Sequence, residues 1–168
     1  YDAAIPLDHP EDIVYTLPEG FRVAGMDEGF DVVKYGQVLW KGFNHELSGE
    51  GPLDLSEKKR AQLTHEMLRP HVDLSLKVAV VAPLGDYAAY CGMWQDPASP
   101  DALVEPVATD PQYRRLGLGK AAVLEGVRRC ALRGAKRALV GSCQQFYYSI
   151  GFRPLNTYTW WKEPEAGK

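Results

Sequence analysis

Pro111-Gln-Tyr-Arg-Arg-Leu-Gly-Leu-Gly-Lys120 is a charged turn with two glycines. It stands between an apolar run, Ala102 to Thr109, that is typical of a strand, and a longer run, Leu118 to Arg133, with helical spacing. Glycines let the backbone approach a ligand closely, and the first N–H groups of a helix lack internal partners at its partly positive end. The stretch predicts an anion-binding loop; the alternative is an ordinary helix start with solvated basic side chains.

The composition is that of one packed domain. The chain has 168 residues, is 45% hydrophobic and holds four tryptophans and nine tyrosines. A net charge of -3 argues against a general nucleic-acid binder, so the local basic cluster indicates small anions instead. No apolar stretch approaches membrane-spanning length, and we expect a soluble protein without a membrane partner.

Three cysteines, Cys91, Cys130 and Cys143, lack paired metal-ligand spacing. Their odd number fits a reducing cytoplasm, and we expect no metal. The chain opens on Tyr1, and residues 1–20 hold three prolines with little periodicity. We expect residues 1–20 to be a linker or N-terminal extension, 21–162 a single domain and 163–168 a tail. We also expect the whole to be a C-terminal domain of a tandem or longer protein.

The remaining segments alternate between strand and helix patterns, which predicts a mixed α/β fold. A β-branched run and a second apolar run flank Pro83-Leu84-Gly85-Asp86 and indicate an antiparallel hairpin. Ser56 is a candidate N-cap and Pro70 a stop for one helix, and Gly134 follows the end of another. We expect strands over Phe21 to Met26, Lys77 to Ala82, Tyr87 to Trp94, Ala102 to Thr109, Arg137 to Gly141 and Phe152 to Lys162, and helices over Asp27 to Gly42, Ser56 to Arg69, Leu118 to Arg133 and Gln144 to Ile150.

The strand Ala102 to Thr109 carries a carboxylate. Strict alternation places Glu105 on one face with Leu103, Val107 and Thr109. A buried glutamate would have a raised pKa and could serve as a general base; the alternative is an exposed or arginine-paired group. Pro106 cannot donate to a sheet ladder, so it marks a bulge or a place where strands part.

The sequence Phe146-Tyr147-Tyr148-Ser149-Ile150-Gly151-Phe152 is typical of a short helix closed by glycine. Phe146 and Ile150 lie one turn apart and would anchor it in the core. A tyrosine hydroxyl beside a thioester could protonate a leaving thiolate, whereas simple aromatic packing is the alternative for Tyr147 and Tyr148.

Together, Arg114-x-x-Gly117-x-Gly119 after a strand and Phe146-Tyr147-x-x-x-Gly151-Phe152 some thirty residues on resemble the GNAT superfamily of acetyl-CoA-dependent N-acyltransferases. The resemblance is strong from about Lys77 to Phe152. It implies an α/β (α+β) fold with a mostly antiparallel sheet of about six to seven strands and about four helices. It also implies a splay between the fourth strand, Ala102 to Thr109, and the fifth, Arg137 to Gly141.

The resemblance further implies a site for acetyl-CoA, with no metal. The pantetheine arm would enter the splay, and the pyrophosphate would lie on the amides of the glycine loop. Tyr147 matches the family's general acid, and Glu105 lies where many members place a base. An asparagine common before the short helix is replaced here by Ser142, Cys143 and Gln144. The implied cofactor-binding residues are Val107, Ala108, Thr109, Arg114, Arg115, Leu116, Gly117, Leu118, Gly119, Lys120, Ser142 and Gln144.

The implied reaction is direct transfer of an acetyl group from acetyl-CoA to a primary amine of a small molecule or peptide. The alternatives are an acyl-enzyme on Cys143 and a non-catalytic acyl-CoA-binding regulatory domain with the same fold. A homodimer or an adjoining domain of the same chain is left open as a partner. A cluster of acidic residues would suit a cationic acceptor, although a solvated charged face explains it equally; these residues are Asp27, Glu28, Asp31, Glu46 and Glu50.

Overall fold

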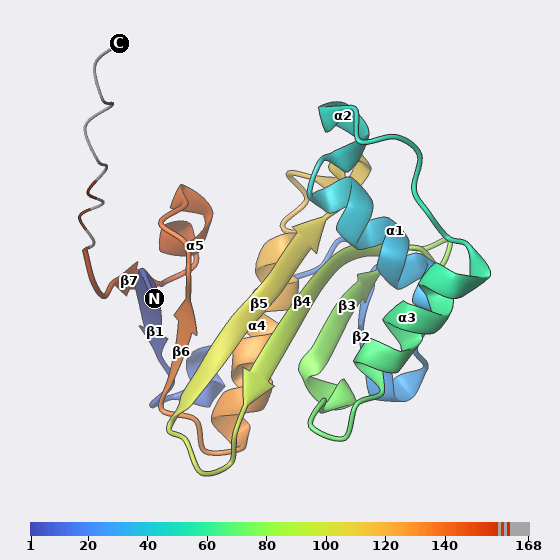
Figure 1. Cartoon of the computed structure of the whole chain (residues 1–168). Coiled ribbons are helices and arrows are strands. Elements are labelled where there is room, and N and C mark those ends of the chain that lie inside the picture. The colour runs from blue at the N-terminus through green and yellow to red at the C-terminus, as the bar shows by residue number, and fades with distance from the viewer. Residues whose placement is uncertain (158, 160, 162–168) are drawn as a thin grey trace.

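A twisted mixed sheet runs through the protein (Figure 1), as a computed structural model of residues 1–157, 159 and 161 shows. Within these residues the sheet has seven strands in the order β2-β3-β4-β5-β6-β1-β7. All neighbouring pairs are antiparallel except β5 and β6, which are parallel. The expected mixed α/β fold with a mostly antiparallel sheet is confirmed. The strands are β1 (Ala3–Pro6), β2 (Arg22–Gly25), β3 (Lys77–Val81), β4 (Tyr87–Gln95), β5 (Asp101–Thr109), β6 (Arg137–Val140) and β7 (Arg153–Pro154).

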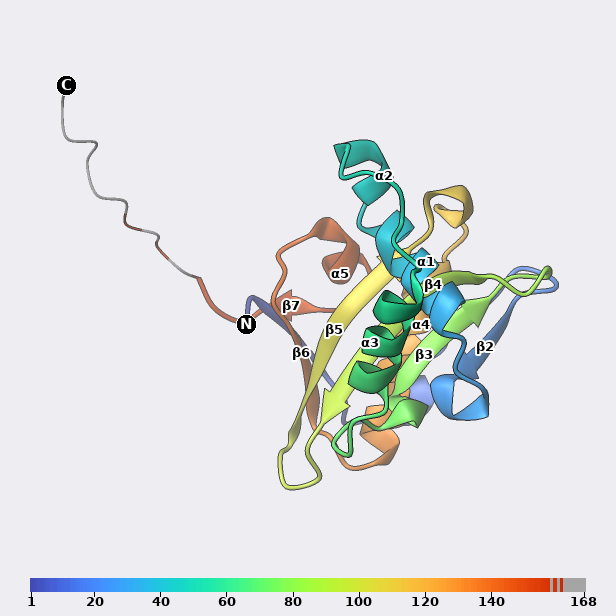
Figure 2. The same ribbon diagram turned by 45° about the vertical axis from the view of Figure 1, so that its right-hand side comes forward.

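Helices cover both faces of the sheet. In Figures 1 and 2, α1 and α3 stand over β2 to β4 on one face, and α4 lies across the opposite face. Because β3 and the first part of β4 are covered on both sides, they are continuously buried apolar runs. The helices among the described residues are α1 (Val32–Gly42), α2 (His45–Ser48), α3 (Glu57–Met67), α4 (Leu118–Leu132) and α5 (Gln145–Ser149).

Local signals account for most helix ends. The Asp31 carboxylate accepts hydrogen bonds from the first N–H groups of α1, and the Ser56 hydroxyl accepts one from Lys59 N at the start of α3. Gly134 follows α4 with a φ of 94°, a conformation that glycine adopts without strain. The expected helix bounds therefore agree with the structure to within a few residues, except that α1 begins at Val32.

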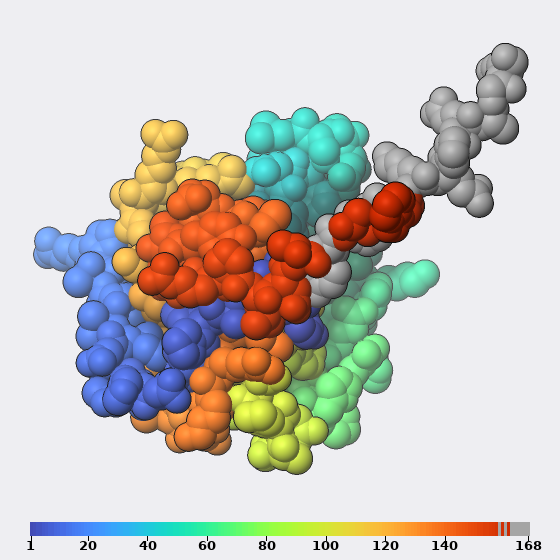
Figure 3. Space-filling model, turned by 90° about the vertical axis from the view of Figure 1, so that its left-hand side faces the viewer, coloured from blue at the N-terminus to red at the C-terminus, as the bar shows by residue number. Residues whose placement is uncertain are grey.

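Some of the N-terminal residues belong to the sheet, so of the two expectations for residues 1–20, a linker or an N-terminal extension, the structure does not fit a linker. Ala3–Pro6 forms β1 between β6 and β7 and pairs with Arg137–Val140 in antiparallel register. Tyr15 also donates a hydrogen bond to the Glu125 carboxylate in α4, at 3.1 Å. Figure 3 shows these residues in blue against the orange and red C-terminal segments. Four residues are too short a run for periodicity to reveal, and their stability comes from pairing with β6.

The C-terminal strand is shorter than expected. The strand consists of Arg153–Pro154, paired with Ala3 and Ala4 of β1, and Leu155 N donates a further 2.9 Å hydrogen bond to the Asp2 carbonyl oxygen. Of the expected strand over Phe152 to Lys162, Tyr158, Trp160 and Lys162 lie outside the described residues, as does the expected tail, 163–168.

Candidate active site

The sheet opens between β5 and β6, as expected. The two strands pair only over Asp101 to Leu103, opposite Arg137 to Leu139, and β5 then continues for six more residues to Thr109. Beyond this point its backbone groups that face β6 have no strand partner among the described residues. A cavity of about 960 Å³ occupies the opening and extends to the start of α4 and to α5. The splay therefore creates a slot lined by main chain on one side.

A bulge in β5 lies at the mouth of this slot. Val104 pairs with Met93 and Val107 with Cys91, so β5 holds one residue more than β4 around Glu105-Pro106. The bulge that Pro106 predicted is confirmed. The extra residue reverses the alternation beyond it. Val107 therefore points to the α4 side, where it packs against the core. Thr109 points to the same side, because a Cβ added at Gly119 of α4 would lie 2.7 Å from Thr109 Oγ1.

The expectation that Glu105, Val107 and Thr109 share one face is therefore wrong. Alternation before the bulge leaves Glu105 with Leu103 on the face opposite α4. After the bulge, the next residue on that face is Ala108, against which Gly42 of α1 packs. Glu105 is thus the last side chain on this face before the strand changes register.

Three residues of β3 and β4 hold the bulge in place. Trp94 Nε1 donates a 2.8 Å hydrogen bond to the Glu105 carbonyl oxygen. The Lys77 ammonium lies 3.3 Å from the centroid of the Trp94 ring and donates to the Met93 carbonyl oxygen at 2.7 Å. A Cβ added at Gly92 would lie only 2.6 Å from the Glu105 carbonyl oxygen. The bulge therefore requires glycine at position 92.

Gly92→Ala should lower the free energy of unfolding by about 1–3 kcal/mol, because the added methyl group meets backbone that can move only if β4 and β5 separate. Denaturant unfolding measures this change. Gly141→Ala is the matched control, since a Cβ there would meet nothing within 4 Å. Equal stability of the two variants would contradict the tight packing of the bulge.

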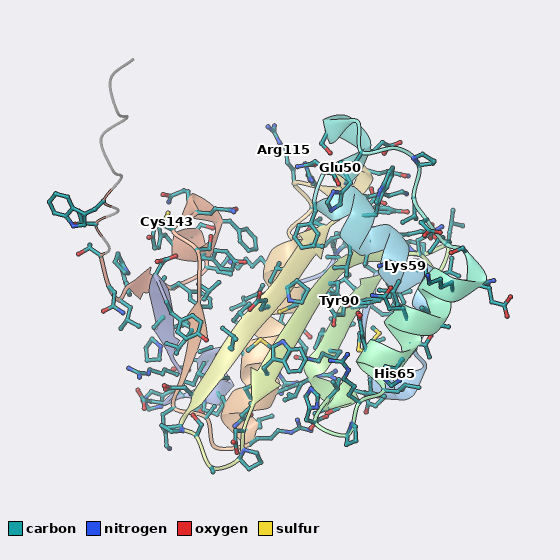
Figure 4. The ribbon with its side chains drawn as sticks, viewed as in Figure 1. Glu50, Lys59, His65, Tyr90, Arg115 and Cys143 are labelled. Carbon is teal, nitrogen blue, oxygen red and sulfur yellow. The ribbon has the colours of Figure 1, made fainter. Side chains whose placement is uncertain are left out.

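The glycine loop presents unpaired N–H groups to the cavity. Arg115 and Gly117 have left-handed backbone conformations, with φ of 65° and 79°. No side chain caps α4, so the N–H groups of its first residues, from Leu118 to Lys120, point out of the helix without intrahelical partners. The side chains of Arg115 and Lys120 are exposed and contact no charged partner among the described residues. Figure 4 shows Arg115 extending outward beyond the end of β5. This end of α4 is suited to a polyanion.

Arg114 has a different role from its neighbours. Its guanidinium donates to the Gly42 carbonyl and to Asn44 Oδ1, at 3.1 and 2.6 Å, and to the Thr109 carbonyl at 3.3 Å. Lys41 at the end of α1 forms a 3.0 Å ion pair with the buried Asp110 carboxylate. Both contacts fasten the end of α1 to the segment that precedes the glycine loop.

Tyr147 enters the cavity from α5. Its ring packs edge-on against Phe146 and Phe152, with centroids 5.0 and 5.5 Å away, and the residue is only 8% exposed. Burial raises the pKa of Tyr147 to about 12, so the hydroxyl stays protonated at neutral pH. No described residue forms a hydrogen bond with this hydroxyl. Tyr147 therefore lines the cavity with a protonated hydroxyl that has no hydrogen-bond partner among the described residues.

Glu105 also lines the cavity, but it is exposed rather than buried. The structure thus favours the alternative of an exposed glutamate. Ser142 and Gln144 line the cavity before α5, where the Ser142 hydroxyl accepts a 3.3 Å hydrogen bond from Gln144 N. Cys143 between them is exposed and lies beside α5 in Figure 4, outside the cavity lining.

Most of the residues singled out in the sequence meet at this one cavity. Both catalytic candidates line it, as do ten of the expected cofactor-binding residues; Ala108 is buried against α1 and Leu116 points to solvent, and neither lines it. Other lining residues lie outside the expected catalytic and cofactor-binding set. Gly42, Phe43 and Asn44 come from the end of α1 and the residues after it, and Asn44 has a left-handed φ of 61°. The remaining ones are Tyr1, Val104, Pro106, Tyr113, Val140, Gly141, Phe146, Ser149 and Ile150.

Among the described residues, no group of three or more histidine, cysteine, aspartate or glutamate side chains could hold a metal ion. No helix in the described part of the chain is long and apolar enough to cross a membrane.

A splayed sheet with an anion-suited loop at the opening defines an acyltransferase class, and comparison with known proteins agrees. The model of the acetyltransferase (GNAT) family matches residues 40–152, which is more than half of the chain. The chain belongs to the GNAT acetyltransferase family, so the resemblance inferred from the two motifs is confirmed. Among curated proteins, no match to this chain was found.

Solved structures share the fold at low sequence identity. A GCN5-related N-acetyltransferase from Sphaerobacter thermophilus aligns with a TM-score of 0.69 and 17% identity, over 92% of this chain and 48% of its own. This chain thus spans about half the length of that relative. An acetyltransferase from Trypanosoma brucei gives 0.59 and 20% identity, over 85% and 99% of the two chains. A GNAT acetyltransferase from Brucella melitensis in complex with acetyl-CoA gives 0.57 and 14%, over 86% and 93%.

Proposed function

We propose that this protein transfers an acetyl group from acetyl-CoA to a primary amine. The observation that carries the proposal is the convergence of the open N-terminus of α4 and Tyr147 on the slot between β5 and β6. The acetyl-CoA complex of the Brucella melitensis structure supports the choice of acyl donor.

The residues at the loop fit a pyrophosphate. The first N–H groups of α4 are available, and Arg115 and Lys120 supply full positive charges beside them. Glycine at position 119 keeps the first turn of α4 close to β5, because a Cβ there would contact Thr109. Acetyl-CoA would supply the acetyl thioester, and its pantetheine arm would follow the unpaired edge of β5.

The chain's own groups account for the proton movements. Glu105 accepts a proton from the amine, directly or through water, as the N–C bond to the acetyl carbon forms. An unpaired main-chain N–H of β5 donates to the carbonyl oxygen as negative charge develops there. Tyr147 gives its proton to the sulfur as the C–S bond breaks, which yields free CoA and an N-acetylated product. The two side chains come from different elements, β5 and α5, so each can act separately.

The acyl-donor site is tested by titrating acetyl-CoA into the protein by calorimetry. Arg115→Glu/Lys120→Glu should weaken binding at least ~100-fold, because two charge-assisted contacts become repulsive. Lys58→Glu/Arg60→Glu on α3 makes the same change in net charge outside the cavity and should bind as the wild type does.

Equal losses in both double variants would show that only net charge matters and would contradict the loop assignment. Acetyl-CoA binding by the wild type without acetylation of any primary amine would favour the alternative, a non-catalytic acyl-CoA-binding domain. No binding at all would overturn the proposed function.

A further inference from the structure

A second cavity, of about 580 Å³, lies on the sheet face opposite α4. Trp94, Leu103 and Leu139 form a row across its floor, because Trp94 pairs with Leu103 in β4 and β5, and Leu103 with Leu139 in β5 and β6. Their neighbours Met93, Ala102 and Ala138 pack on the α4 side, which fixes the row on the other face. In Figure 1, α1 and α3 cover β2 to β4 on this face. The α1 helix reaches β5 at its far end, where Gly42 packs against Ala108, beyond the row.

The row leads directly to the proposed reaction centre. Glu105 lies two residues beyond Leu103 on the same face, about 7 Å along the strand at the usual rise per residue. It lines the first cavity where β5 and β6 part, and Tyr1 lines both cavities. A molecule lying on Leu103 and Trp94 would therefore present its near end to Glu105.

The polar groups around the row carry little free charge. Gln95 pairs with Ala102, so its side chain points to the α4 side and away from the row. Asp96 supplies a carboxylate at the rim, whereas Asp73 and Asp101 are neutralised by ion pairs with Arg133 and Arg137.

Lys77 disfavours a positive charge at the end of the ligand that lies over Trp94. Its ammonium lies under the Trp94 ring and is only 2% exposed, so it does not contact a ligand itself. Burial lowers the pKa of Lys77 to about 8, which leaves it mostly protonated at neutral pH. A second cation over Trp94 would be repelled, and an uncharged apolar or aromatic arm would not. Three of the acidic residues that suggested a cationic acceptor in the sequence have partners close by in the chain. Asp31 caps α1, the Glu28 carboxylate accepts a hydrogen bond from Gly25 N, and Glu50 pairs with His45.

We propose that this second cavity binds the acceptor, and that the acceptor is a primary amine with a short apolar or aromatic arm. The inference rests on the proposed acetyl transfer and assigns its substrate class. In this arrangement Trp94, Leu103 and Leu139 hold the arm, and the amine reaches Glu105.

The test compares phenethylamine, ethylamine and spermidine as acceptors at saturating acetyl-CoA, by release of free CoA. Phenethylamine should have at least ~10-fold higher kcat/KM than either of the others, because its ring covers apolar surface on the row. Leu103→Gln should raise the KM for phenethylamine about tenfold with little change in kcat. Leu84→Gln makes the same substitution in the β3–β4 turn, where the side chain is 91% exposed, and should behave as the wild type does.

The outcomes separate the two proposals. Acetylation of ethylamine or spermidine with no preference for phenethylamine, and no effect of Leu103→Gln, would overturn the acceptor cavity and leave acetyl transfer standing. Acetyl-CoA binding without acetylation of any of the three, together with no binding of phenethylamine in calorimetry, would overturn both. A preserved acetyl-CoA affinity of Leu103→Gln establishes that this variant is folded.

Discussion

Tyr147→Phe should lower kcat about 10²–10⁴-fold, the range usual for loss of a positioned proton donor. The substitution removes only the hydroxyl. The ring contacts with Phe146 and Phe152 remain, so α5 should keep its place. Acetyl-CoA affinity should stay close to that of the wild type, because the pyrophosphate contacts lie on the glycine loop. Steady-state kinetics and calorimetry on the same preparation measure both quantities.

Tyr148→Phe is the matched control for this prediction. The neighbouring tyrosine packs against the core and does not line the cavity. Comparable losses of activity in both variants would indicate a packing role for the tyrosines and would contradict Tyr147 as the acid. The raised pKa of Tyr147, about 12, adds a further expectation. The rate should not fall from loss of its proton as the pH rises through 10, the ordinary value for tyrosine.

Glu125→Gln should lower the free energy of unfolding by about 3 kcal/mol, the lower end for breaking a buried ion pair. Glu125 is 4% exposed in α4 and accepts hydrogen bonds from Arg128, Arg129 and Tyr15. The lower end applies because the Arg128 side chain is 37% exposed and remains hydrated. Denaturant unfolding of this variant and of Glu19→Gln, an exposed glutamate without a described partner, measures the difference.

The same glutamate makes stability depend on pH. Burial opposes ionisation of Glu125, but hydrogen bonds and charge from the two arginines outweigh it and lower the pKa. The interaction of Glu125 with the two arginines therefore stabilises the fold fully above the ordinary glutamate pKa of about 4.3. This stabilisation is lost as the pH falls through the lowered pKa that Glu125 has in the folded protein. The wild type should lose more stability than Glu125→Gln between about pH 5 and the acid limit of folding. Parallel pH profiles of the two proteins would contradict the assignment.

The acyl-donor side of the site was predictable because its chemistry is local. The loop from Arg114 to Lys120 needs only consecutive residues: glycines, basic side chains and a helix start. The short helix with Tyr147 is likewise contained in seven residues. For the same reason, Pro106 alone was enough to predict the bulge and the parting of strands, since a missing N–H is a property of one residue.

The acceptor side was less accessible to sequence reasoning. Phe43 and Asn44 reach the cavity because Arg114, 70 residues away from Asn44, fastens the end of α1 to the loop. The face of Val107 was predicted wrongly because the bulge adds one residue to β5, and a shift of one residue moves every later side chain to the other face. The residues of β5 do not themselves show whether the side chains switch faces before or after Pro106.

By itself, the sequence determined the family, the order of most strands and helices, and the residues that meet at the α4 end of the slot. These depend on motifs and periodicities within a few consecutive residues. Tertiary structure alone decided that Ala3–Pro6 completes the sheet beside β6, and that Trp94, Leu103 and Leu139 form one row leading to Glu105. Strand order and register are set by pairing between segments far apart in the chain, and a single sequence carries no local signal for that pairing.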